Sequence, residues 1–160
     1  SIGIVSTSLA NRCIQTVEQI IKDSCSDKKI KSTEILTSPA MFNLELATQT
    51  HCAEGSLKNI AHKLSRKQNL PGFNSVDITA EKLLDYIFSV GNEYDKLDLF
   101  CTHDFNIVLL LLYLMPNFKS MDVIVENWPA PLEGIYIWGK RYDFFFSWKG
   151  NIYHYKYSDD

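Results

Sequence analysis

The sequence predicts a mixed α/β fold, in which a largely parallel central sheet is flanked by helices and followed by a C-terminal antiparallel hairpin. Two short apolar runs, residues 2–7 and 96–102, each precede a helical pattern, and strands that alternate with helices are typical of parallel sheets. Residues 133–157 differ, because three aromatic-rich runs are separated there by tight turn signals. The chain has 160 residues, 46% of them hydrophobic, which suits a single domain over 1–160.

The first part of the chain predicts a strand, a helix and a second strand. Residues 2–7 are apolar and β-branched, as in a buried strand. Apolar residues at helical spacing then predict a helix from Leu9 to Lys22, with Ser8 as its N-cap. Residues 30–39 predict another short strand, which ends at Pro39.

The middle of the chain, residues 40–95, is predicted to be mostly helical. A loosely amphipathic pattern covers 42–67, and the Pro-Gly pair at 71–72 marks a turn. The pattern from residue 78 onward is clearly amphipathic and predicts a helix that ends near Gly91.

The last part predicts a strand at 96–102 and a buried helix at 105–115. A short extended piece is expected at 121–126. The aromatic runs of 133–157 are expected to form a hairpin or meander that closes the sheet.

Composition argues against several classes of function. The net charge of −3 gives no electrostatic footprint for nucleic acid. The four cysteines include no Cys-x-x-Cys pair, so a zinc site is not expected. No other metal and no cofactor is assigned to the chain. The apolar run Ile107–Met115 is far shorter than the roughly 20 residues that span a bilayer, so no membrane partner is expected.

Polar residues follow two of the predicted strands, at 6–12 and at 101–104. In open α/β sheets, ligands bind beyond the carboxyl ends of strands, where helix N-termini offer free N–H groups. Arg12 on the first helical turn suits a phosphoryl group, which a guanidinium grips through two parallel hydrogen bonds. His103 supplies a second donor and Asp104 a proton for a leaving group. The sequence therefore predicts an anion pocket at the strand ends.

Helix capping is the competing interpretation of these polar residues. Thr102 or Asp104 can accept the free N–H groups of a helix that starts there, and Thr7 and Ser8 suit turn and cap positions. Under this interpretation the chain is an α/β protein without a phosphate site.

The two motifs resemble those of the histidine phosphatase superfamily. "TSLANRCIQTV" is similar to its Thr-Ser motif with an arginine four residues after the serine, and "FCTHDFNIVLLLLYL" to its Ser/Thr-His-Asp motif at a strand end. The His-Asp form and "WPAPLEGIYIW" resemble the histidine acid phosphatase branch. The resemblance covers both ends of the chain. It implies a phosphoglycerate mutase-like fold, with the middle of the chain as a variable segment.

The resemblance also implies a role for each site residue. Arg12 and His103 would bind phosphate, His103 would stabilise the transferring phosphoryl group, and Asp104 would protonate the leaving oxygen. The expected partner is inorganic phosphate or a phosphorylated small molecule. The family's nucleophile is the histidine of an Arg-His-Gly tripeptide, and no histidine here follows an arginine.

Three hypotheses follow from the missing tripeptide. The first is the phosphate pocket of a phosphatase whose Arg-His-Gly segment lies upstream of Ser1 or in a second chain that completes the sheet. The second is an inactive pseudophosphatase that binds a phosphorylated ligand or a protein partner. The third is the unrelated α/β protein of the capping interpretation.

The sequence assigns no specific role to several other residues. Glu126, Trp128 and Glu133 are placed near the mouth of the pocket. His51 beside Cys52 raises the alternative of a thiol nucleophile acting with His103, but no activating pattern accompanies the pair. The aromatic residues 144–148 are expected to pack within the hairpin.

Overall fold

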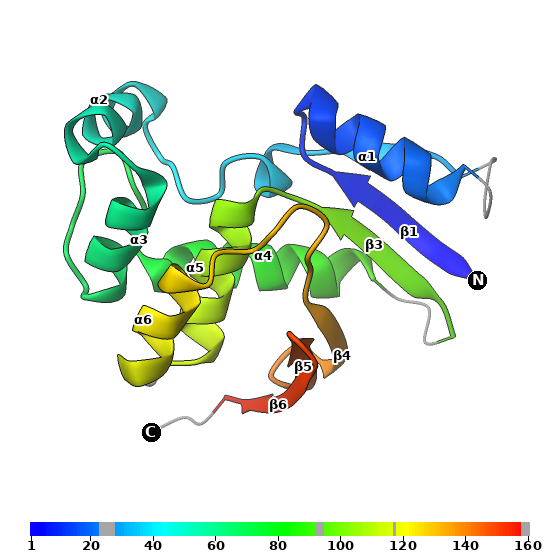
Figure 1. Ribbon diagram of the computed structural model, residues 1–160. Helices are drawn as coiled ribbons and strands as arrows, with labels where there is room; N and C mark the ends of the chain where they lie inside the picture. The colour runs from blue at the N-terminus through cyan, green and yellow to red at the C-terminus, as the bar shows by residue number, and fades with distance from the viewer. Residues whose placement is uncertain (23–27, 92–94, 117, 158–160) are drawn as a thin grey trace.

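The protein is a mixed α/β structure with two separate three-stranded sheets (Figure 1). The computed structural model describes residues 1–22, 28–91, 95–116 and 118–157. A parallel sheet has the order β2-β1-β3 and consists of β1 (Ile2–Thr7), β2 (Ile30–Ser32) and β3 (Leu97–Cys101). An antiparallel sheet has the order β4-β5-β6 and consists of β4 (Tyr136–Lys140), β5 (Asp143–Trp148) and β6 (Asn151–Lys156).

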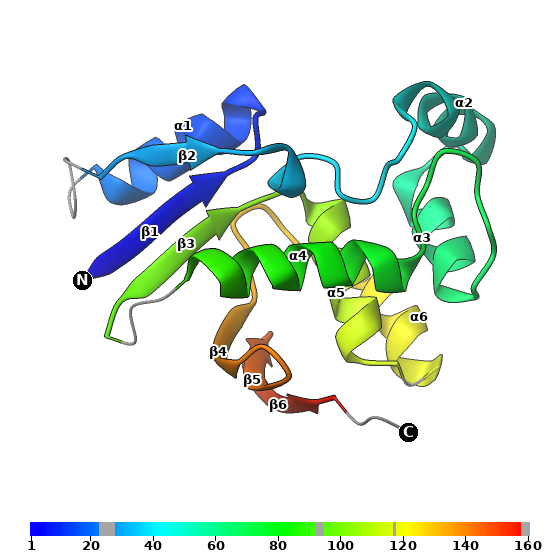
Figure 2. The same cartoon turned by 180° about the vertical axis from the view of Figure 1, so that it is seen from behind.

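Helices lie on both sides of the parallel sheet, and the pair α2 (Leu44–Glu54) and α3 (Leu57–Ser65) lies at the end of the molecule away from the N-terminus (Figures 1 and 2). In chain order the helices are α1 (Asn11–Ile21), the short 3-10 helix η1 (Glu34–Leu36), α2 (Leu44–Glu54), α3 (Leu57–Ser65), α4 (Val76–Val90), α5 (Asp104–Leu114) and α6 (Phe118–Glu126).

The parallel sheet is covered on both faces. Val17 and Ile21 of α1 pack with Val5 of β1 in a small core. On the other face Tyr86 of α4 lies edge-on to Phe100, and its hydroxyl is 2.7 Å from Ser6 Oγ. A strand covered on both sides suits a continuous apolar run, which explains the sequence of β1.

The larger core surrounds α5, whose apolar residues face in all directions. Leu109 and Leu111 are completely buried. A helix that is hydrophobic all round must be enclosed on every side. Here α3, α4, α6 and the second sheet provide that enclosure.

The C-terminal strands form the predicted antiparallel meander, but the prediction that they close the parallel sheet is wrong. They form a sheet of their own because their inner face packs on the helical core. Phe144 and Phe146 are buried there, whereas Phe145 between them is exposed. The Phe144 ring lies 5.3 Å from that of Phe88 in α4, and Arg141 forms an ion pair with Asp85 at 2.8 Å.

Residues 121–126 are also corrected, since they belong to helix α6 and not to an extended piece. The apolar residues alternate closely enough to suggest a strand. However, Met121, Ile124 and Val125 also follow the i, i+3, i+4 spacing of a helix face, and that face packs on the main core. Tertiary packing decides between the two patterns.

Smaller differences concern where elements begin and end. The strand at 30–39 stops at Ser32, because Thr33 caps η1 by accepting the Ile35 N–H. The helical stretch 42–67 is two helices, separated at Gly55, which has the left-handed φ of 76° that favours glycine. The helix predicted to end near Gly91 does so.

Candidate functional site

The pairing of β1 with β3 brings two strand ends together. Thr7 is the register partner of Cys101, and the Ser8 N–H donates to the Cys101 carbonyl at 2.9 Å. The residues that follow both strands therefore lie side by side. These are the segments that the sequence singled out at 6–12 and 101–104.

The ring of His103 is hydrogen-bonded at both nitrogens by residues from the other strand end. Its Nε2 lies 2.9 Å from Ser8 Oγ, and its Nδ1 lies 2.9 Å from Arg12 Nη2. Arg12 is the second residue of α1, so its side chain reaches across to the start of α5. The structure thus brings Arg12 and His103 into direct contact.

These contacts define the tautomer of His103. A guanidinium has donors only, so Arg12 must donate and Nδ1 must accept. The proton of the neutral imidazole is then on Nε2, which donates to Ser8 Oγ. The same hydroxyl oxygen also accepts the Ala10 N–H at 3.1 Å. Ser8 is completely buried and therefore holds the ring in one orientation.

The surroundings of His103 favour its neutral form. Burial and the charge of Arg12 lower the pKa of His103, and the opposite charge of Asp104 offsets only part of this effect. The unfolded chain therefore binds a proton at this position more readily than the folded one. We expect His103 to contribute stability above about pH 6.5 that is lost as the pH falls below this value.

Asp104 is held at both carboxylate oxygens. Its Oδ1 accepts the Phe105 N–H at 2.8 Å, and its Oδ2 accepts the indole Nε1–H of Trp128 at 2.7 Å. Asp104 and Arg12 are exposed, whereas His103 is half-buried. The charged groups of the site therefore lie at the surface above the buried Ser8.

The capping interpretation explains part of this arrangement, because Asp104 Oδ1 accepts the free N–H of Phe105 at the start of α5. It does not account for the contacts of Thr102 and Ser8. His103 is the N-cap residue of α5 and makes no side-chain cap hydrogen bond. Thr102 Oγ1 donates to the Leu36 carbonyl at 2.6 Å and so ties β3 to η1. Ser8 does not cap α1 as predicted, because the helix begins later, with Ala10 as its N-cap residue.

Two residues of the site differ from the expectation that their sequence positions raise. Ser8 is expected to be a helix cap but binds His103, and Trp128 is expected near the pocket mouth without a role but binds Asp104. The position of Ser8 directly after a strand was the available signal. The position of Trp128 depends on the loop after α6, which no local pattern predicts.

The other two residues expected near the pocket mouth bind elsewhere. Glu133 accepts the Ala130 N–H at 2.8 Å, and Glu126 lies 3.4 Å from the His62 ring.

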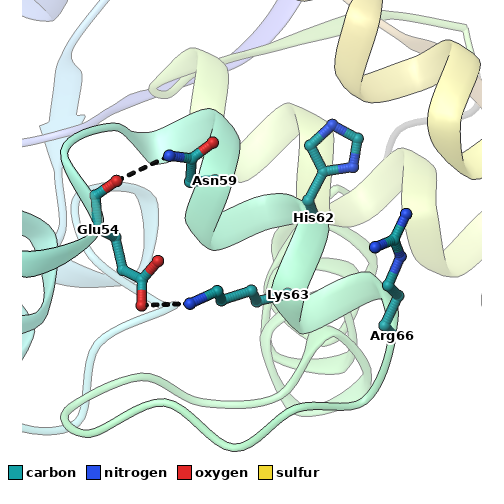
Figure 3. A pocket seen from close by; sticks show the side chains of 5 residues that line it. All are labelled: Glu54, Asn59, His62, Lys63 and Arg66. Atoms are coloured by element: carbon teal, nitrogen blue, oxygen red, sulfur yellow. Dashed lines mark hydrogen bonds and ion pairs between the residues drawn. The ribbon is translucent and has the colours of Figure 1, made fainter.

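A second group of charged residues lines a hollow of about 470 Å³ on another part of the molecule (Figure 3). Its walls are Glu54, Asn59, His62, Lys63 and Arg66. The cations there are paired, Lys63 with Glu54 at 2.6 Å and Arg66 with Asp122 at 3.7 Å. His51 and Cys52 lie exposed on α2, and the structure shows no hydrogen bond from either described side chain to His103.

The site offers the chemistry of anion binding and proton transfer. The Arg12 guanidinium and the N-terminus of α5 favour a bound anion, and His103 adds a donor at Nδ1 once its ring is protonated. The Asp104 carboxylate lies beside them. The described ranges contain no group of three or more His, Cys, Asp or Glu side chains that is arranged to hold a metal ion. Of the helices described, none has both the length and the apolar character needed to cross a membrane. No protein-family model and no curated protein matches the chain.

The tautomer of His103 predicts that anion binding takes up a proton. An anion between Arg12 and His103 replaces the hydrogen bond at Nδ1 and favours the imidazolium, so sulfate affinity should rise as the pH falls from about 8 to about 6, by at most about tenfold per pH unit. Sulfate keeps its charge over this range. Calorimetric titrations in two buffers of different ionisation enthalpy measure the proton uptake.

The control for this measurement is His103→Gln, which cannot take up the proton. The variant should bind sulfate with little dependence on pH. Equal proton uptake by the variant and the unmodified chain would contradict the assignment to His103.

Proposed function

We propose that Arg12, His103 and Asp104 form the phosphate pocket of a phosphomonoester hydrolase similar to histidine acid phosphatases, within a phosphoglycerate mutase-like fold. The observation that carries the proposal is the 2.9 Å contact between Arg12 Nη2 and His103 Nδ1 across two paired strand ends. This contact brings the Arg12 guanidinium together with the His103 ring, whose Nδ1 becomes a donor when the imidazole is protonated, beside Asp104. The grouping supports the roles that the resemblance implies.

The proposed roles follow from the chemistry of phosphoryl transfer. Arg12 grips two phosphoryl oxygens, and His103 stabilises the charge that spreads over them in the transition state. The nucleophilic histidine forms a P–N bond while the P–O bond to the leaving group breaks. The electron pair of that bond stays on the leaving oxygen, which takes the proton of Asp104 and departs as an alcohol.

The nucleophile is proposed to come from a segment outside these residues or from a second chain. The other three histidines are engaged or placed elsewhere: His51 is exposed on α2, His62 faces Glu126 at 3.4 Å, and His154 binds Asp143 at 2.7 Å. In the sheet as described, β3 is an edge strand. An additional parallel strand beside it would place its carboxyl end next to His103.

A pseudophosphatase is the second candidate, and the absence of Arg-His-Gly from the sequence favours it. Such a protein uses the same pocket to hold a phosphorylated ligand or a phosphorylated protein partner without turnover. Both candidates predict anion binding at Arg12, so only turnover separates them.

Phosphate or vanadate should stabilise the chain against heat. At about ten times its Kd, a ligand of the folded state contributes about 1.4 kcal/mol, which raises the Tm of a domain of this size by roughly 3–6 °C. Arg12→Ala should abolish the rise. Differential scanning fluorimetry measures it.

The matched control is Arg66→Ala, which removes the same side chain from the charged hollow of Figure 3. It should leave the rise intact. Equal rises or equal losses in the two variants would show that the anion acts nonspecifically.

The chain by itself should not turn over a phosphate ester, because the histidine that accepts the phosphoryl group is missing. Its rate with a generic aryl phosphate should not exceed that of His103→Ala. Addition of a segment that bears Arg-His-Gly, as a fusion or a separate peptide, should restore hydrolysis. Binding without restored turnover would favour the pseudophosphatase, and robust turnover by the chain alone would mean that the nucleophile is misassigned.

A further inference from the structure

The carboxylate of Asp104 is oriented by two donors that come from different parts of the chain. One is the backbone N–H of Phe105 in the same helix, and the other is the indole N–H of Trp128, 24 positions along the sequence. A carboxylate with one such contact can rotate about its side-chain bonds. With a donor at each oxygen, its plane is defined.

Trp128 is itself held in place by its surroundings. Its ring stacks on that of Phe105, with centroids 6.4 Å apart and planes inclined by 21°. The loop that carries it is tied to the β5–β6 turn through Lys149, whose Nζ lies 3.3 Å from the Asn127 carbonyl and 3.6 Å from Glu133 Oε2. The indole N–H is therefore presented to Asp104 by a supported loop.

We propose that Trp128 is a positioning residue for Asp104, an inference that rests on the proposed function. Each carboxyl oxygen has two lone pairs. Asp104 can therefore accept both N–H groups and still carry the proton that it gives to the leaving oxygen. The indole orients the Asp104 carboxyl group so that its proton points toward the leaving oxygen, whereas Arg12 and His103 hold the phosphoryl group.

This division of roles predicts a specific kinetic pattern. Proton donation matters most for a poor leaving group, such as an alkoxide, and little for an activated phenolate. Loss of the indole N–H should therefore reduce kcat for an alkyl phosphate by about tenfold or more. The same loss should have little effect on the KM for the alkyl phosphate or on the rate with a dinitrophenyl phosphate.

The contact itself is tested on the chain alone by NMR. The sequence has three tryptophans, each of which gives one indole N–H signal in a ¹H–¹⁵N spectrum. Asp104→Asn replaces a charged acceptor by a neutral one, so the Trp128 signal should shift upfield, since charge-assisted hydrogen bonds are the shorter ones. The Trp138 and Trp148 signals should stay in place. A Trp128 signal that does not respond would overturn the proposal.

The matched variants for kinetics are Trp128→Phe and Trp138→Phe, assayed with the Arg-His-Gly segment added. Both keep an aromatic ring, but Trp138 lies on the exposed face of β4. Only Trp128→Phe should lower kcat for the alkyl phosphate while leaving the rate with the dinitrophenyl phosphate nearly unchanged. An equal loss with both substrates would assign Trp128 a structural role and overturn the proposal. If no variant hydrolyses any substrate, the proposed function fails, and the NMR result still decides whether Trp128 orients Asp104.

Discussion

The parallel pairing of β1 with β3 is the constraint on which the site depends. Because Thr7 lies opposite Cys101, the chain leaves both strands at the same level, and Ser8 and His103 come within hydrogen-bond distance. The pairing is fixed by packing on both faces, from α1 on one side and Tyr86 on the other. A change of register by one residue would turn the side chains of β1 to the opposite faces and separate the two strand ends.

The contact between Arg12 and His103 is a hydrogen bond between a cation and a neutral ring. Burial and the guanidinium charge both lower the pKa of His103, so the two groups coexist without like-charge repulsion in the absence of a ligand. An anion between them changes this balance, because it attracts both groups and favours the imidazolium. The site is therefore expected to couple anion binding to proton uptake, with Ser8 as the fixed support of the ring.

The sequence predicted much of the fold from periodicity, and it selected Arg12, His103 and Asp104 from their positions after strands. Strand β1 and the apolar part of helix α5 are recognisable because burial on every side leaves a nearly continuous apolar run. The separate second sheet and the helical state of 121–126 depend on which surfaces pack together, and local patterns do not contain that information. Trp128 reaches Asp104 through a loop whose path is set by Lys149 and Phe105.

The location of a bound anion is the sharpest test of the phosphate pocket at Arg12 and His103. Tungstate has the shape and charge of a phosphate dianion and gives a strong anomalous X-ray signal, so a crystal soaked with it reveals where such an anion binds. We predict a tungsten peak within hydrogen-bond distance of both the Arg12 guanidinium and the His103 ring. A peak at Lys63 and Arg66, with the Arg12–His103 contact unchanged, would contradict this prediction.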